Sequence, residues 1–374
     1  MNVLITGGAG FIGSALAIKL LDNKYNVTVL DNLSEQIHGQ KPEKSELYLK
    51  IRDKVNFIKG DVRNLEDWKI AVQNQHVIIH LAAETGTGQS MYEIERYVDV
   101  NSKGTALFLD YLANNKTSVK KVVIASSRSI YGEGKYIDVN NNIHFPESRN
   151  EVQMNQKQFE PQFNGTKLTA VATDESSKIH PISIYGITKQ VQEQLVLNVC
   201  KSLGISGVAL RFQNVYGPGQ SLTNPYTGIL SVFSNLILNN KPINIFEDGL
   251  ESRDFVYIDD VVNSLYLTLL NENVYNDSYN VGTGVGTTVL EVAKILQKCY
   301  GIEVPTFISG NYRLGDIRHN YADISKITKD LNWAPTTDIN QGLENFSKWV
   351  LNQELPELQY EKSLNEMKEK GMFK

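Results

Sequence analysis

Two side chains suited to acid–base chemistry stand four residues apart in the segment SIYGITK, namely Tyr185 and Lys189. That spacing places both on one face of a helix. A phenol is a poor base at its ordinary pKa of about 10, but nearby positive charge favours the phenolate and brings the pKa toward neutrality. The pair therefore predicts a tyrosine that takes a proton from a substrate hydroxyl. The alternative is an ordinary pair on a helix surface.

A second set of polar groups ends the apolar run KVVIASS, which presents Ser126 and Ser127 after Ala125. If this run is a parallel strand, both serines lie at the carboxyl edge of a sheet, where ligands bind in open α/β folds. A hydroxyl there is able to hold the oxygen that exchanges a proton with Tyr185. Unless these serines only cap or turn the chain, Ser127, Tyr185 and Lys189 form a catalytic set.

A dinucleotide site is predicted by TGGAGFIGS, which sets Gly7, Gly10 and Gly13 between a strand and a helix. Glycines there allow a tight turn and a close approach to a pyrophosphate, and the helix start offers free N–H groups. Asp31 closes the second run, NVTVLD, 18 residues after Gly13. A carboxylate there binds ribose hydroxyls and repels a 2′-phosphate, which favours NAD over NADP. Asp61 either faces the adenine or forms a turn. The other predicted cofactor contacts are Phe11, Ile12, Asn32, Val62, Leu81, Ala82, Ala83, Asn101 and Ser126.

The elements that must position these groups alternate along the chain. Short apolar runs are separated by amphipathic helical stretches such as residues 13–21 and 102–113, a pattern typical of a parallel sheet covered on both faces. We therefore expect an α/β, doubly wound Rossmann fold with a smaller, mostly C-terminal substrate-binding lobe. The runs begin at Asn2, Asn26, Val55, His76, Lys121 and Gly207.

Changes in the alternation of apolar runs and helical stretches suggest the domain boundaries. Residues 1–213 plus about 246–284 are expected to form the dinucleotide-binding domain, and about 214–245 plus 285–352 the second lobe. Residues 132–181 form a polar insertion, with a short hairpin expected at 159–172 around Asn164-Gly165. Such a long segment is either a substrate lid or assembly element, or a neutral surface insertion. The charged tail, 353–374, is expected to be a surface helix or a frayed end.

Bulk composition excludes several classes of protein. The formal net charge is −5 and the pI is about 5.8, which disfavours nucleic-acid binding. Cys200 and Cys299 are the only cysteines and lack the spacing of a metal site, so we expect apolar packing. No run approaches the length of a membrane span, and the N-terminus reads as a strand. We therefore expect a cytoplasmic protein.

The chain resembles the extended short-chain dehydrogenase/reductases that modify nucleotide sugars. The motifs that carry this resemblance are, in chain order, TGGAGFIGS, GDVRN, HLAA, ASSRSIYG, YGITK, LRFQNVYGPG, SRDFVYIDDV, NVGTG and LGDIRH. The resemblance covers roughly residues 1–350. It implies NAD, a nucleotide-diphosphate sugar bound between the lobes, and a homodimer formed through helices near 105–113 and 188–200. It implies that Asn214, Arg253 and Arg313 contact the diphosphate and Asp316 the nucleotide ribose. It places Asn101 near the nicotinamide, and Thr85, Gln89, Ser90 and Ser127 along the sugar, with the base near 224–233.

Two departures from the family pattern bear on the reaction. The family's Tyr-Phe-Asn is Phe212-Gln213-Asn214 here, and the insertion lacks the paired cysteines of similar sequences, so no metal is expected. The family's 4,6-dehydratases carry an Asp-Glu pair where this chain has Arg128 and Ser129. A sugar 4-epimerase acting on a UDP- or dTDP-hexose is therefore the expected activity. A 4-ketoreductase and a non-catalytic dinucleotide-binding protein are the alternatives.

Overall fold

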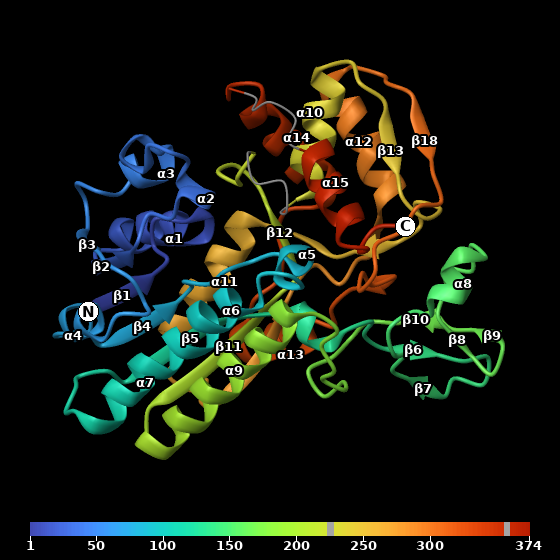
Figure 1. The fold of residues 1–374 in the computed structure, drawn as a ribbon. Coiled ribbons are helices and arrows are strands. Elements are labelled where there is room, and N and C mark those ends of the chain that lie inside the picture. The colour runs from blue at the N-terminus through green and yellow to red at the C-terminus, as the bar shows by residue number, and fades with distance from the viewer. Residues whose placement is uncertain (223–227, 355–359) are drawn as a thin grey trace.

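The structure is a computed structural model that describes residues 1–222, 228–354 and 360–374. Within these residues, seven parallel strands form one sheet in the order β16-β11-β5-β4-β1-β2-β3 (Figure 1). The chain order reverses between β1 and β4, which opens a crevice at the carboxyl ends of the strands. The bounds are β1 (Asn2–Thr6), β2 (Asn26–Asp31), β3 (Asn56–Lys59), β4 (Val77–His80), β5 (Lys121–Ser127), β11 (Ser206–Phe212) and β16 (Asp277–Val281).

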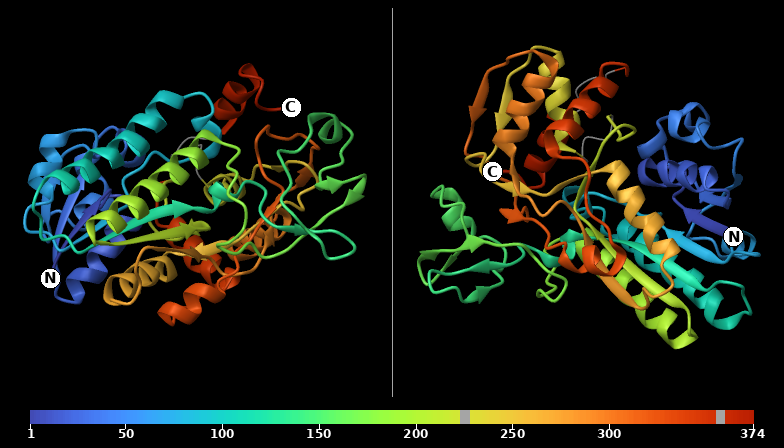
Figure 2. Two further views of the ribbon diagram at one scale, coloured as in Figure 1. Left: turned by 90° about the horizontal axis from the view of Figure 1, so that it is seen from below. Right: turned by 180° about the vertical axis from the view of Figure 1, so that it is seen from behind.

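Both faces of this sheet are covered, as the apolar runs predict. Val3 and Ile5 of β1 join the core beneath α1 (Phe11–Asp22) and α11 (Ile258–Leu270). Leu4, between them, joins a second core on the opposite face. That core contains side chains of α4 (Leu65–Ala71), α7 (Gly104–Asn114) and α9 (Ile184–Leu203). Because successive strand residues point to opposite faces, the doubly wound fold is confirmed (Figure 2).

Strand β16 is the one that the apolar-run criterion misses. Its sequence, DSYNV, carries polar residues, yet Asn280 is fully buried. The Asn280 side chain accepts a hydrogen bond from the Tyr131 hydroxyl at 2.8 Å and donates to the Thr173 carbonyl at 2.9 Å. Hydrogen-bonded partners offset the cost of burying the amide, so polarity in the sequence conceals a central strand.

The C-terminal lobe consists mainly of helices above one end of the sheet (Figure 1). Helix α12 (Val289–Tyr300) contacts both α10 (Ile229–Leu238) and α14 (Ile339–Val350). Beside them, β13 (Ile243–Ile245) pairs with β18 (Thr306–Ile308), and β14 (Ser252–Arg253) lies between β17 (Thr287–Thr288) and β19 (His319–Asn320). Strand β15 (Phe255–Tyr257) pairs with β12 (Asn214–Tyr216) and leads from this lobe back into α11.

The insertion has its own small structure, drawn in green in Figure 1. Strands β10 (Thr169–Ala170), β6 (Tyr136–Ile137) and β7 (Ile143–His144) form one sheet, and α8 (Glu151–Asn155) stands beside it. Strands β8 (Gln162–Phe163) and β9 (Thr166–Lys167) form a hairpin. Asn164 and Gly165 both have positive φ, 50° and 76°, which an Asn-Gly hairpin turn requires. The predicted hairpin is confirmed.

Buried ion pairs attach the insertion to the C-terminal lobe. Arg318 is fully buried, and its guanidinium lies 2.8 Å from Glu160 of the insertion and 2.9 Å from Glu247. Arg149 of the insertion lies 2.7 Å from Glu247 and 3.3 Å from Glu133. Since charges taken from water need close partners, this network anchors the insertion.

The C-terminal tail is docked rather than frayed. Helix α15 (Tyr360–Glu369) precedes a final segment that pairs with residues 312–314, through Tyr312 N–H to the Lys374 carbonyl at 2.8 Å and Leu314 N–H to the Met372 carbonyl at 3.0 Å. Phe373 is 7% exposed and packs against Phe246, with ring centroids 4.9 Å apart. Across the three described ranges, no helix combines the length and apolarity that crossing a membrane requires.

Candidate active site

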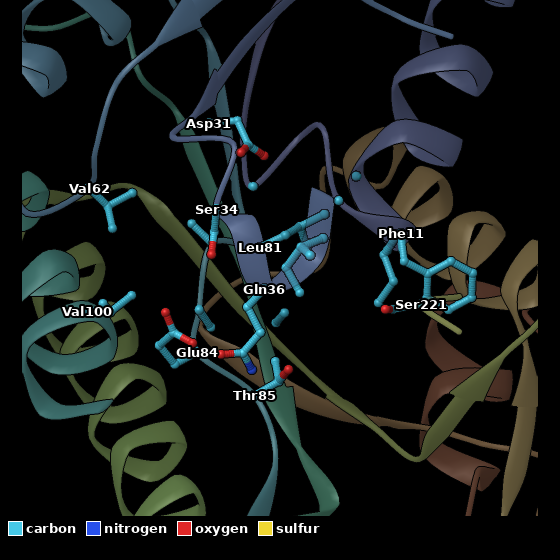
Figure 3. Close-up of a pocket in the computed structure, with 18 of the residues that line it drawn as sticks. Phe11, Asp31, Ser34, Gln36, Val62, Leu81, Glu84, Thr85, Val100 and Ser221 are labelled. Atoms are coloured by element: carbon cyan, nitrogen blue, oxygen red, sulfur yellow. The ribbon is translucent and has the colours of Figure 1, made fainter. Parts of the chain in front are cut away.

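A cavity of about 410 Å³ lies at the carboxyl ends of β1, β2, β4 and β5 (Figure 3). It brings together residues predicted from six separate parts of the sequence. Those lining it are Gly7, Gly10, Phe11, Ile12, Gly13, Asp31, Asn32, Asp61, Val62, Leu81, Ala82, Ala83, Thr85, Ser126, Ser127, Tyr185 and Lys189. The remaining predicted site residues lie beside the cavity or farther into the C-terminal lobe.

The glycine turn has no room for side chains. Gly7 has a φ of 66°, and a Cβ there would lie 2.8 Å from the backbone nitrogen of Ala82. A Cβ on Gly13 would lie 2.3 Å from the Gly7 carbonyl oxygen. Gly10 is the N-cap of α1 and supplies no side-chain hydrogen bond to the helix. The first N–H groups of α1 are therefore free to bind the phosphates of a dinucleotide.

Asp31 is held rigidly at the end of β2. It is 8% exposed, and its two carboxylate oxygens accept hydrogen bonds from the backbone N–H of Ala9 at 2.9 Å and Leu33 at 2.8 Å. Burial raises its pKa, and these bonds and His38 oppose that rise. Together with the glycine turn, the fixed carboxylate fits an adenosine ribose that carries no 2′-phosphate.

Asp61, which lines the cavity after β3, is held by Arg63 and Asn32. Its carboxylate lies 2.8 Å from the Arg63 guanidinium and accepts a hydrogen bond from the Asn32 amide at 3.0 Å. The Arg63 hydrogen bond lowers the pKa of Asp61 to about 2. The carboxylate therefore stays charged and serves as a fixed acceptor at this end of the cavity.

A hydrogen-bonded latch joins the loop after β2 to the loop after β4. The Arg96 guanidinium donates to the Gln36 amide oxygen and to the Glu84 carboxylate, both at 2.7 Å. The Gln36 amide in turn donates to Gln89 at 2.9 Å. Gln36, Glu84 and Thr85 lie together at the cavity in Figure 3. Gln89, predicted to touch the sugar, is 4% exposed and belongs to this latch.

Tyr185 and Lys189 lie in the first turns of α9, which Ser183 caps through a bond from Gly186 N–H at 3.1 Å. Lys189 is 3% exposed, and its ammonium donates to the Ala125 carbonyl at 3.0 Å, 6.0 Å from the centre of the Tyr185 ring. Burial lowers the pKa of Lys189 to about 7.

Ser127 meets Tyr185 at the same end of the cavity. Burial raises the pKa of Tyr185, while a hydrogen bond with Ser127 and the charge of Arg128 lower it. The Ser127 oxygen accepts bonds from the Ser129 backbone N–H at 3.2 Å and the Ser129 hydroxyl at 3.0 Å. These two donors leave the Ser127 proton to point toward Tyr185 or a substrate oxygen.

Three predicted contacts are engaged with the protein itself. The Asn101 amide bridges the Glu84 backbone and the Thr188 hydroxyl, which ties the loop after β4 to α9. Ser90 is fully buried and accepts a bond from Tyr185 N–H at 3.0 Å. Ser126 donates to Glu193 at 2.5 Å. These side chains position the loops and helix around the cavity, and their predicted ligand contacts stay predictions.

The residues expected to bind the diphosphate form a separate cluster beyond the cavity. Arg253 lies 2.8 Å from Asp316, and the Arg313 guanidinium stands 5.1 Å from the Phe246 ring centre. Burial raises the pKa of Asp316, but Arg253, Arg313 and other guanidinium groups outweigh it and hold that pKa below its usual range. Asn214 accepts a bond from Arg128 at 2.8 Å. Of the expected base-binding segment, residues 224–227 lie outside the described residues.

Two residues at the site were not predicted as ligands. Arg128 reaches the Asn214 side chain, and Gln213 lines the cavity with both its amide atoms unpaired at 4% exposure. Gln213 stands where this chain departs from the family's Tyr-Phe-Asn, and Arg128 stands where the family's 4,6-dehydratases carry the first residue of an Asp-Glu pair. Those departures were the available signal.

Comparison with known proteins identifies the class. The family model for the NAD dependent epimerase/dehydratase family matches residues 3–152 and 164–282. The chain belongs to that family.

Among its relatives is a dTDP-L-rhamnose 4-epimerase of Burkholderia thailandensis, 36% identical over 93% of this chain and 94% of that protein. A putative UDP-glucose 4-epimerase of Methanocaldococcus jannaschii is 32% identical over 94% and 98%. Among solved structures, the UDP-glucuronic acid 4-epimerase of Bacillus cereus, in complex with UDP-glucuronic acid and NAD, gives a TM-score of 0.77 at 28% identity over 94% and 99%.

Proposed function

We propose that the chain is an NAD-dependent nucleotide-diphosphate-sugar 4-epimerase that acts on a UDP- or dTDP-hexose. The observation that carries this proposal is the meeting of Tyr185, Ser127 and Lys189 at one end of the cavity that Asp31 bounds at the other. The family's dependence on NAD and the names of its 4-epimerase members support it.

In the proposed reaction, Tyr185 takes the proton of the hexose 4-hydroxyl. The Ser127 hydroxyl, oriented by Ser129, holds that oxygen as it becomes a carbonyl. The bound NAD supplies the acceptor and then the donor of hydride at C4. Burial lowers the pKa of Lys189 to about 7. When the Lys189 amine carries its proton, its positive charge favours the Tyr185 phenolate. Once the 4-keto sugar has rotated within the cavity and hydride has returned to the opposite face of C4, Tyr185 gives its proton back to the C4 oxygen.

The residues after Ser127 favour epimerisation over elimination. Removal of water across C5 and C6 needs an acid and a base beside the sugar. In this chain Arg128 and Ser129 follow Ser127, and neither supplies a carboxyl group. We therefore expect a 4-keto sugar formed here to be reduced again at C4 rather than to lose water.

The test is C4 inversion by the purified protein, followed by NMR with UDP-glucose, UDP-galactose and dTDP-rhamnose. We expect inversion of one of them with no added cofactor, and Tyr185→Phe is expected to retain NAD and lose turnover by at least about 100-fold. Tyr275→Phe, at a side chain 49% exposed, is the matched control. Stoichiometric oxidation of added NADH would instead identify a 4-ketoreductase, and inactivity with retained NAD would favour a binding protein.

We further propose a cytoplasmic homodimer formed through α7 and α9. These helices pack against each other, and Leu107, Tyr111, Leu195 and Val199 are only partly buried on them. A second copy covering these side chains would form a four-helix interface. Light scattering should give twice the chain mass of 42.0 kDa. Leu195→Glu is expected to reduce the measured mass to that of a single chain.

A further inference from the structure

Arg128 presents a guanidinium group whose hydrogen-bonding capacity is mostly unused. Its Nε donates to the Asn214 side chain at 2.8 Å. Neither terminal nitrogen has a hydrogen-bond partner among the described residues, and no described carboxylate lies within 4.0 Å. Arg128 is only partly buried, so part of the residue is open to solvent and to a ligand.

The neighbouring arginines differ in this respect. Both terminal nitrogens of Arg253 are hydrogen-bonded within the protein. They donate to Asp316 and to the carbonyls of Ser252, Ile317 and Arg318, at 2.7–3.0 Å. Arg313 lies over the Phe246 ring, and its Nε is enclosed and unpaired. Arg253 is therefore occupied by the protein, whereas the terminal nitrogens of Arg128 and Arg313 have no hydrogen-bond partner among the described residues, and of these two only Arg128 adjoins Ser127.

The electrostatic surroundings leave the Arg128 charge poorly balanced. Burial and then the charge of Arg253 lower the pKa of Arg128 to about 10, although Asp316 opposes them. The group remains protonated near neutral pH, but its strongest charged neighbour is another cation. A half-buried charge without a paired anion is costly, and an anionic ligand would remove that cost.

The position of Arg128 connects the reacting end of the site to the diphosphate cluster. It directly follows Ser127, which lines the cavity, and it bonds Asn214, which directly follows the cavity residue Gln213. On the other side it acts on Arg253 and Asp316. A group bound by the open nitrogens would thus lie between the sugar carbon near Ser127 and the nucleotide.

We propose that Arg128 binds an anionic oxygen of the sugar nucleotide, through its two free terminal nitrogens, and so fixes the substrate against the Ser127 end of the cavity. This inference rests on the proposed function, because it takes a nucleotide sugar as the ligand. Two parts of such a substrate carry the required chemistry: the phosphoryl group next to the hexose, and a carboxylate on the hexose itself. A planar guanidinium binds either in a two-pronged manner.

The experiment compares equilibrium binding to the NAD-loaded wild type, Arg128→Met and Arg128→Lys by calorimetry. The probes are UDP, UDP-glucose and UDP-glucuronate, with dTDP in parallel, and uridine followed by ligand-detected NMR. Arg52→Met is the matched control, since Arg52 is 43% exposed and pairs with Asp53. Loss of a charged hydrogen-bonded pair predicts at least 10-fold weaker binding to Arg128→Met. Lysine keeps the charge without the fork and should fall between.

Each outcome decides the matter. Weakening of UDP and both sugar nucleotides, with uridine unchanged, supports a phosphoryl ligand. Weakening confined to UDP-glucuronate supports a hexose carboxylate. Binding within twofold of wild type for every probe overturns the proposal, and so does equal weakening of uridine and UDP, which would indicate a structural role. Normal Arg128-dependent binding without C4 inversion would reject the proposed reaction and leave this inference standing. Failure of the wild type to bind any nucleotide diphosphate would reject both.

Discussion

Replacement of Arg318 by methionine tests how the insertion is held. Arg318 is fully buried between the insertion and the C-terminal lobe. Its guanidinium lies 2.8 Å from Glu160, 2.9 Å from Glu247 and 2.7 Å from Asp248. Methionine keeps much of the volume and removes the charge, so the change isolates the ion pairs.

The expected loss follows from what the three nearest carboxylates retain. Removing one member of a buried ion pair costs about 3–5 kcal/mol, because the partner charge is left uncompensated. Here Glu247 keeps Arg149 at 2.7 Å, Glu160 keeps His319 at 3.2 Å, and Asp248 is 39% exposed and can be hydrated. The lower end therefore applies, and the free energy of unfolding should fall by about 3 kcal/mol.

Urea denaturation measures this change, and limited proteolysis locates it. Cleavage near the 162–167 hairpin should become faster in Arg318→Met because the insertion opens locally. Lys348→Met is the control: it removes an ion pair with Glu344 whose members are 67% and 51% exposed, and exposed pairs contribute at most about 1 kcal/mol. A loss below about 1 kcal/mol in Arg318→Met, with unchanged proteolysis, would refute the view that this network anchors the insertion.

Three further changes test other parts of the structure. Arg96→Ala removes the centre of the latch and should speed NADH release about tenfold in stopped-flow fluorescence; an unchanged rate would mean the latch does not retain the cofactor. Burial raises the pKa of Glu133 to about 7 from an ordinary 4.5, so its stabilising contribution is lost as the pH rises from about 4.5 to 7. Glu133→Gln should therefore flatten the fall in unfolding free energy between pH 5 and 7.5, and an equally steep fall would contradict this. Phe373→Ala should undock the tail and speed hydrogen exchange of the Tyr312 and Leu314 amides at least about tenfold, whereas unchanged protection would show that the aromatic contact does not hold the tail.

Local patterns were enough for the central sheet and the dinucleotide cavity. Each of the six apolar runs is a strand, because a strand buried on both faces needs continuous apolar residues. The Asn164-Gly165 hairpin is also visible in two residues, since its turn needs positive φ at both. The sequence patterns did not predict strand β16. This strand contains Asn280, whose hydrogen-bond partners Tyr131 and Thr173 are more than 100 residues away.

In the candidate site, too, some features follow from local sequence and others from tertiary contacts. The sequence by itself determined the glycine turn, Asp31 at the end of β2, and the Tyr185–Lys189 spacing, because each depends on a strand end or a helix turn within a few residues. Only the tertiary structure decided that Arg253 is satisfied by Asp316 while Arg128 stays open. It also decided that buried ion pairs hold the insertion and that the tail docks. These outcomes depend on which distant side chains share a desolvated space, and no local pattern encodes that.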